Sequence, residues 1–278
     1  MRVDSAVPDF LAFWARAEGE SREVQRRLWR ELYEEPNLEL FDLYYTNWAR
    51  PDMLDAALDR FADEAGTIAE RADLLPGQIA DAARATADFL GQPLPELDVQ
   101  LLVGLFSSDG WVTTFRDRTT LFLAVEYIPP YDAVFFAHEC THLVHRGAGF
   151  DRDTVAGSVI AEGLAVAVSA ELEPGHEEAV YLWMREGQEA WLAECVARES
   201  ELSERLRADL DSENPDVSAR WFLGRPNDSG LPSRSGYFLA HRLVVELGVP
   251  YRELVTWDYE QARAALDASG VRGGGEVG

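Results

Sequence analysis

The sequence contains no lysine, so its basic side chains, histidine aside, are all arginines. A chain without lysine cannot form a Schiff base on a lysine amine, which excludes that route of covalent catalysis. Acidic residues number 50 and arginines 25, giving a formal net charge of −25. This charge repels nucleic acid and anionic membranes, so we expect neither as a partner. We attribute the acidity to a solvated surface, with attraction of cationic substrates as the alternative.

Cysteine is also scarce, because Cys140 and Cys195 are the only two in the chain. Two cysteines do not make a disulfide framework and fit a reducing compartment, where we interpret both as packing residues. No stretch approaches the roughly 18 apolar residues of a membrane span. The first residues lack the basic and then apolar pattern of a secretion signal. We therefore predict a cytoplasmic protein.

The fold class predicted from residue patterns is α+β, mainly helical with a small, mostly antiparallel sheet. Apolar residues recur at helical spacing over residues 8–90, with breaks at Pro36 and at Pro76. β-branched and aromatic residues are typical of strands, and they gather in three short segments, residues 99–106, 111–115 and 119–125.

The rest of the chain is predicted to be helical, with one loop-rich stretch over residues 214–230. The predicted helices cover residues 132–146, 153–171, 176–210 and 235–247, with a short helix from residue 251. Glycine and proline gather at residues 91–95. This predicts a boundary between an N-terminal helical region, residues 1–92, and a second region, residues 93–278, in which the sheet precedes the helix described next.

The chemistry is concentrated in the segment His138-Glu139-Cys140-Thr141-His142. Two histidines four residues apart lie on one face of a helix and can reach one metal ion. Glu139 then lies beside the metal, where a general base for a metal-bound water is needed, and H-E-x-x-H is the signature of this arrangement. The surrounding segment is apolar, so these polar groups need partners or a metal when buried. The alternative is a pair of hydrogen-bonded core histidines.

Glu162 is the best candidate for a third ligand, because a catalytic zinc site uses three protein ligands and one open position. It is flanked on both sides by apolar residues, in Val159-Ile160-Ala161-Glu162-Gly163-Leu164, so a buried carboxylate here calls for a cation. A glutamate facing solvent or paired with an arginine is the alternative. His145 competes as a ligand, but it lies seven residues from His138, or about 10.5 Å along a helix.

These motifs resemble those of the gluzincin metallopeptidases, and more closely a bacterial family of predicted zinc-dependent proteases, the DUF2268 or YjaZ-like group. The similarity covers roughly residues 95–250: a strand-rich segment, the H-E-x-x-H motif, Glu162-Gly163-Leu164-Ala165, and a later Gly236-Tyr237. The resemblance implies a gluzincin, thermolysin-like core in residues 93–278. It also implies that His138, His142 and Glu162 bind Zn²⁺ and that Glu139 is the base.

Tyr237 and His241 are candidates for stabilising the oxyanion, since they lie four residues apart on one predicted helix and gluzincins commonly use a tyrosine or histidine there. Arg234 is a weaker candidate. The alternatives are a core tyrosine and a surface histidine.

The function we predict from the sequence is that of a zinc metallopeptidase with a peptide or protein substrate. A strand at the sheet edge within residues 111–125 would bind an extended substrate. The alternatives are a non-catalytic metal-binding scaffold or regulatory protein, and a hydrolase of a non-peptide amide or ester. The sequence leaves the native metal, the cleavage specificity and the oligomeric state open.

Overall fold

The computed structural model describes residues 1–127, 130–150, 154–223 and 230–268. The chain divides into two units, one of Met1–Asp81 with Glu96–Pro129, the other of Ala82–Pro95 with Pro130–Gly278. The sheet is therefore grouped with the N-terminal helices. The sequence pattern instead predicted a boundary after residue 92, with the sheet in the C-terminal region. Each unit is described by itself below.

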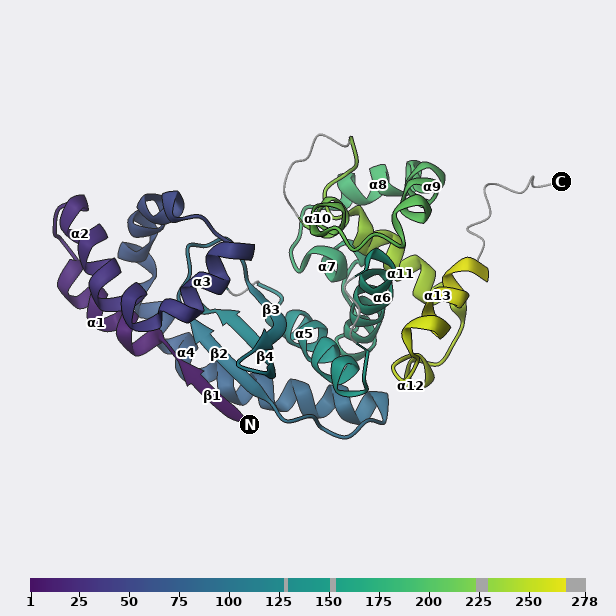
Figure 1. Ribbon diagram of the computed structural model, residues 1–278, viewed down its shortest axis with the longest axis horizontal. Coiled ribbons are helices and arrows are strands. Elements are labelled where there is room, and N and C mark those ends of the chain that lie inside the picture. The colour runs from purple at the N-terminus through teal and green to yellow at the C-terminus, as the bar shows by residue number, and fades with distance from the viewer. Residues whose placement is uncertain (128–129, 151–153, 224–229, 269–278) are drawn as a thin grey trace. The chain divides into compact units, whose positions relative to one another are not determined.

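The first unit contains a four-stranded sheet of order β1-β2-β4-β3 (Figure 1). Its strands are β1 (Arg2–Ser5), β2 (Asp98–Leu102), β3 (Gly110–Phe115) and β4 (Arg118–Ala124). β2 pairs in parallel with both β1 and β4, and only β3 and β4 form an antiparallel hairpin. The sheet is mixed, so the prediction of a mostly antiparallel sheet was wrong.

Two long-range events explain this mixed pairing. β1 was not predicted, because four residues are too few to show the alternation of apolar and polar residues that is typical of a strand. The chain between β1 and β2 is helical, and parallel strands need such a long crossover connection. The segment after β2 leads to the outer strand β3, and the tight turn at Arg116 and Asp117, both with positive φ, returns the chain as β4 beside β2. The strands predicted at residues 111–115 and 119–125 are confirmed as β3 and β4.

An aromatic cluster fills the helical side of the first unit. The helices here are α1 (Val7–Ala17), α2 (Arg22–Trp29), α3 (Leu38–Asn47) and the first part of α4 (Leu54–Leu90). Pro8 lies in the first turn of α1, where its missing N–H costs nothing. Trp29 stacks on Phe61 at 5.9 Å and meets Tyr33 edge-on at 4.8 Å. These rings are almost fully buried and form the core of this part of the unit.

Helix α4 continues through Pro76, where the sequence predicted a break. A proline inside a helix removes one hydrogen bond and costs about 3 kcal/mol. Ile68, Leu75 and Ile79 are buried on either side of it, and their packing offsets this local cost. The burial of the apolar residues on both sides of Pro76 therefore outweighs the tendency of proline to break a helix.

The second unit is helical throughout its described residues. Its elements are the end of α4, α5 (Asp132–Gly147), α6 (Val155–Leu172), α7 (Glu178–Trp183), α8 (Glu189–Ala197), α9 (Glu199–Asp209), α10 (Pro215–Phe222), α11 (Ser235–Leu247), α12 (Tyr251–Leu254) and α13 (Tyr259–Ala268). α6 packs against both α5 and α11 at the centre of the unit (Figure 1). The predicted helices at residues 132–146, 153–171 and 235–247 are confirmed, although residue 153 lies outside the described residues.

Two predicted segments of this unit differ from the structure. The single long helix over residues 176–210 is instead α7, α8 and α9, since Met184 takes a left-handed conformation (φ 54°) that ends α7. The stretch 214–230 was predicted to be loop, but α10 occupies its first part, begun by the Asn214 side chain accepting from the Asp216 N–H. Residues 224–229 of that stretch lie outside the described part of the chain.

Helix α6 is long and apolar enough to cross a membrane by length and composition, contrary to the sequence-based statement that no stretch approaches this. About two-thirds of its apolar window, 67%, is buried inside the protein. That burial is typical of the core helix of a soluble protein, and Glu162 lies on this helix.

Candidate metal centre

Helix α5 presents His138 and His142 on one face, as their spacing predicts. The helix is apolar over most of its surface and eleven of its residues are buried. The His138 side chain is 2% exposed and that of His142 14%. Their Nε2 atoms lie 3.2 Å apart. The burial of α5 therefore forces two imidazoles together in a place with little water.

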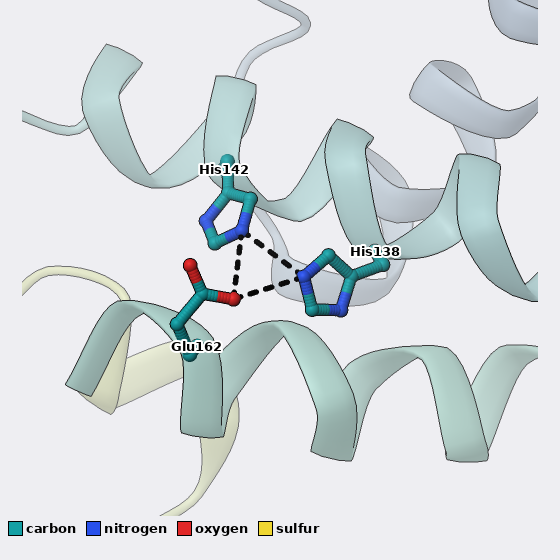
Figure 2. Close-up of side chains that lie close together, drawn as sticks. All are labelled: His138, His142 and Glu162. Carbon is teal, nitrogen blue, oxygen red and sulfur yellow. Dashed lines mark hydrogen bonds and ion pairs between the residues drawn. The ribbon is translucent and has the colours of Figure 1, made fainter. Parts of the chain in front are cut away.

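Helix α6 brings Glu162 to the same point (Figure 2). Glu162 Oε2 lies 3.0 Å from His138 Nε2 and 3.4 Å from His142 Nε2. A tetrahedral zinc ion with ligand bonds of roughly 2.0–2.2 Å spaces its ligand atoms by about 3.4 Å. The three atoms thus form a triangle of nearly the size that one zinc ion needs, and the donor set of two imidazoles and a carboxylate suits zinc.

Gly163 explains how α6 comes so close to its neighbours. A Cβ atom at this position would lie 2.3 Å from the Ala240 carbonyl oxygen and 2.6 Å from a Val244 methyl group, both on α11. Only glycine leaves room for this approach. The residue next to the third ligand therefore sets the distance between α6 and α11.

The electrostatics of the triangle are those of a carboxylate held by imidazoles. Burial lowers the pKa of His138, and the contact with Glu162 only partly opposes this. Burial also disfavours the charged form of His142, but the charge of Glu162, the hydrogen bond with Glu162 and the charge of Glu139 together outweigh it and raise the pKa of His142. For Glu162 burial favours the neutral acid, yet the charge of His142 and the contacts with both rings lower its pKa. The site therefore holds an ionised carboxylate that needs a cation, which a metal ion would supply.

The second ring nitrogen of His138, which faces away from the triangle, lacks among the described residues the hydrogen bond that is usual for a metal-binding histidine. His138 Nδ1 is buried and has no hydrogen-bond partner among the residues the structure describes. Metal-binding histidines usually donate this second N–H to a carboxylate or carbonyl, which fixes the ring. Packing takes over part of that role here, because the Tyr237 ring lies 6.1 Å from the His138 ring, centroid to centroid.

Glu139 is buried on α5, with 7% of its surface exposed. Its negative charge is one of the causes, after Glu162, that raise the pKa of His142, so its carboxyl group lies near the triangle. This location is compatible with the predicted role as a base.

Tyr237 and His241 lie on α11, and the structure separates their surroundings. The Tyr237 ring contacts His138 and also Phe222, at a centroid distance of 5.6 Å. His241 Nδ1 instead lies 3.5 Å from Glu178 Oε1, an ion-pair distance longer than a usual hydrogen bond. Interaction with His241 is the main cause that lowers the pKa of Glu178. Tyr237 is therefore adjacent to a metal ligand, whereas His241 lies near a carboxylate from α7 without a hydrogen bond from its Nδ1 to any described residue.

His145, the competing ligand, does not join the group. Its ring stacks on Phe150 at 4.3 Å, and burial lowers its pKa to about 3. It is a neutral core histidine one turn beyond the triangle. Within the described residues, the group of His138, His142 and Glu162 is the one that could hold a metal ion.

Two features of this region were not found from the sequence. Glu178 gives no signal, because it follows another glutamate in an ordinary acidic stretch. Arg234 was predicted only as a weak candidate for stabilising the oxyanion, because its stacking on aromatic rings depends on tertiary contacts.

Comparisons of the chain with protein-family models, with curated proteins and with solved structures found no match.

Proposed function

We propose that this protein is a zinc-dependent hydrolase and that its substrates are peptides. The observation that carries the proposal is the His138, His142 and Glu162 triangle, whose atom spacing fits one tetrahedral ion. It is supported by Glu139, which follows the first histidine in sequence and is buried near the second. The likeness of these motifs to gluzincins and to the DUF2268 or YjaZ-like group belongs to the same proposal, as do a gluzincin core and a cytoplasmic location.

A bound zinc ion would lower the pKa of a coordinated water and polarise the carbonyl group of the substrate. The chain supplies the other parts. Glu139 accepts the proton of the attacking water and later delivers it to the leaving amine. The buried surroundings strengthen these charge interactions by excluding bulk water.

The developing oxyanion requires a donor besides the metal. Tyr237 is our first choice, because its ring lies against His138 on the neighbouring helix. His241 is the second choice, because it lies one turn further along the same helix as Tyr237 and near the carboxylate of Glu178. A phenol or imidazole in such a role contributes typically 10²–10³-fold to kcat.

The test is a peptide-library digest by the zinc-loaded protein, with small amides and esters included. Glu139→Gln should bind zinc as the wild type does and show no turnover, since an amide cannot accept the proton. Glu171→Gln changes an exposed carboxylate on α6 and serves as the matched control. Cleavage that a chelator abolishes and that only Glu139→Gln loses supports the peptidase.

Other outcomes separate the alternatives. Turnover of amides or esters without peptide cleavage would redirect the proposal to a non-peptide substrate. Zinc binding without any turnover would favour a metal-binding scaffold or regulatory protein. An active Glu139→Gln variant would rule out the mechanism.

A further inference from the structure

Arg234 is a cation that has no acidic partner within the described part of a strongly acidic chain. Its Nη2 donates a hydrogen bond to the Leu182 carbonyl oxygen at 3.1 Å. Its Nε is buried and has no hydrogen-bond partner, and no carboxylate of the described residues pairs with the guanidinium. The chain carries 50 acidic residues for 25 arginines, so an unpaired, half-buried guanidinium is not explained by a lack of available anions.

The side chain is held in place by aromatic rings. Arg234 Cζ lies 4.0 Å from the centroid of the Tyr237 ring and 5.0 Å from that of Trp183. Its backbone is left-handed (φ 60°) at the N-terminus of α11, a conformation that residues other than glycine rarely adopt. Stacking fixes the plane of the guanidinium. With Nε buried and Nη2 bound to Leu182, the terminal nitrogens, Nη1 above all, are the ones that can bind a second group. The fork is therefore preorganised rather than loosely solvated.

The same Tyr237 ring contacts Arg234 and the metal ligand His138. A cation this close to a proposed metal centre repels the metal ion. A negatively charged group bound between or beside them would relieve that repulsion, and a planar carboxylate matches the geometry of a guanidinium fork.

We propose that Arg234 binds a carboxylate of the substrate, so that the centre prefers peptides with a carboxylate close to the scissile bond. This rests on the proposed function, because the carboxylate is placed relative to the zinc site. The carboxylate is either the C-terminus of the peptide or an acidic side chain, and the experiment below separates these sources.

The test measures binding of thiol probes to the zinc-loaded, full-length protein by calorimetry, so that it does not depend on turnover. The three probes are a mercaptoacetyl-dipeptide with a free C-terminal carboxylate, its C-terminal amide, and an amide that carries one glutamate side chain. The thiol reports the metal centre in all three. We expect at least one carboxylate probe to bind at least tenfold more tightly than the plain amide, as a charge-assisted hydrogen bond predicts.

Two variants assign the preference to Arg234. Arg234→Gln should lose the tenfold preference and keep its affinity for the plain amide within about twofold. Arg185→Gln is the matched control, since Arg185 also stacks on Trp183, at 4.4 Å, but is exposed. It should leave the preference unchanged.

Equal affinity of the wild type for all three probes would overturn the role of Arg234 while leaving the zinc site intact. An equal loss for all probes in Arg234→Gln would also overturn it, because that places the residue at the metal or in the fold. Absence of zinc-dependent binding of every probe would overturn the proposed function itself, and this proposal with it.

Discussion

Replacing Gly163 by alanine tests the packing that places the third ligand. The added Cβ would meet the Ala240 carbonyl oxygen at 2.3 Å, whereas ordinary contact begins at 3.4 Å. The two helices must therefore separate by about 1 Å in a close-packed interior. Overpacking of this kind costs about 1–3 kcal/mol, and here the obstructing atom belongs to the backbone and cannot rotate away.

A compensating term acts in the opposite direction, because alanine is favoured over glycine in a helix by about 1 kcal/mol. Because the obstructing atom is backbone, we take the upper end of the overpacking cost, about 3 kcal/mol, which after the gain of about 1 kcal/mol leaves Gly163→Ala less stable than the wild type by about 2 kcal/mol. The displacement also moves Glu162, so zinc affinity should fall by about tenfold or more.

Gly66→Ala provides the matched control. Gly66 also lies within a helix, α4, but a Cβ there would have no atom within 4 Å. This variant should be as stable as the wild type or up to about 1 kcal/mol more stable. Urea unfolding followed by circular dichroism and a zinc titration measure both effects. If Gly163→Ala matched Gly66→Ala in stability and bound zinc normally, the close approach of α6 and α11 would not depend on glycine at position 163.

Three further changes have expected outcomes. Burial raises the pKa of Glu126 to about 7 from 4.5, so the native state holds an extra proton between these values and stability falls as pH rises through them. Glu126→Gln should lack this fall, so that its stability relative to the wild type improves by about 3 kcal/mol from pH 4.5 to above 7 in urea titrations; a pH-independent difference would contradict this. Tyr33→Phe removes a buried hydroxyl that accepts from the Val103 N–H at 2.7 Å and donates to its carbonyl at 2.8 Å. Denaturant unfolding should show a loss of about 2–4 kcal/mol, and a loss near zero would mean that water replaces the hydroxyl. His145→Gln should bind zinc like the wild type in a competition titration, whereas His142→Gln should not; equal loss in both would make His145 a ligand.

Local sequence signals predicted which three side chains the structure brings together. His138 and His142 are brought together by helix geometry alone, because a four-residue spacing fixes the face. Glu162 stands out because a carboxylate in an apolar helix needs a partner, and the structure supplies the two histidines. The first inference rests on helix spacing and the second on the apolar residues that flank Glu162, and both features can be read from the sequence.

Long-range pairing was the part that the sequence could not predict. Nothing in Arg2–Ser5 indicates that it pairs in parallel with Asp98–Leu102, since strand partners far apart in the chain are chosen by tertiary packing. The helix break predicted at Pro76 was wrong for the opposite reason. Proline is a strong local signal against a helix, but the buried apolar residues on either side of it keep α4 continuous. Arg234 required the positions of Trp183 and Tyr237, which come from two separate helices.

The most direct test of the metal centre is elemental analysis of the purified, dialysed protein by mass spectrometry. The wild type should retain about one zinc per chain, and His142→Ala and Glu162→Ala should lose or weakly bind it, since a structural or catalytic zinc site fails without one of three protein ligands. Glu171→Ala, on the same helix as Glu162 but exposed, should retain the ion. A wild-type protein that holds no zinc and cannot be loaded with it would contradict the account.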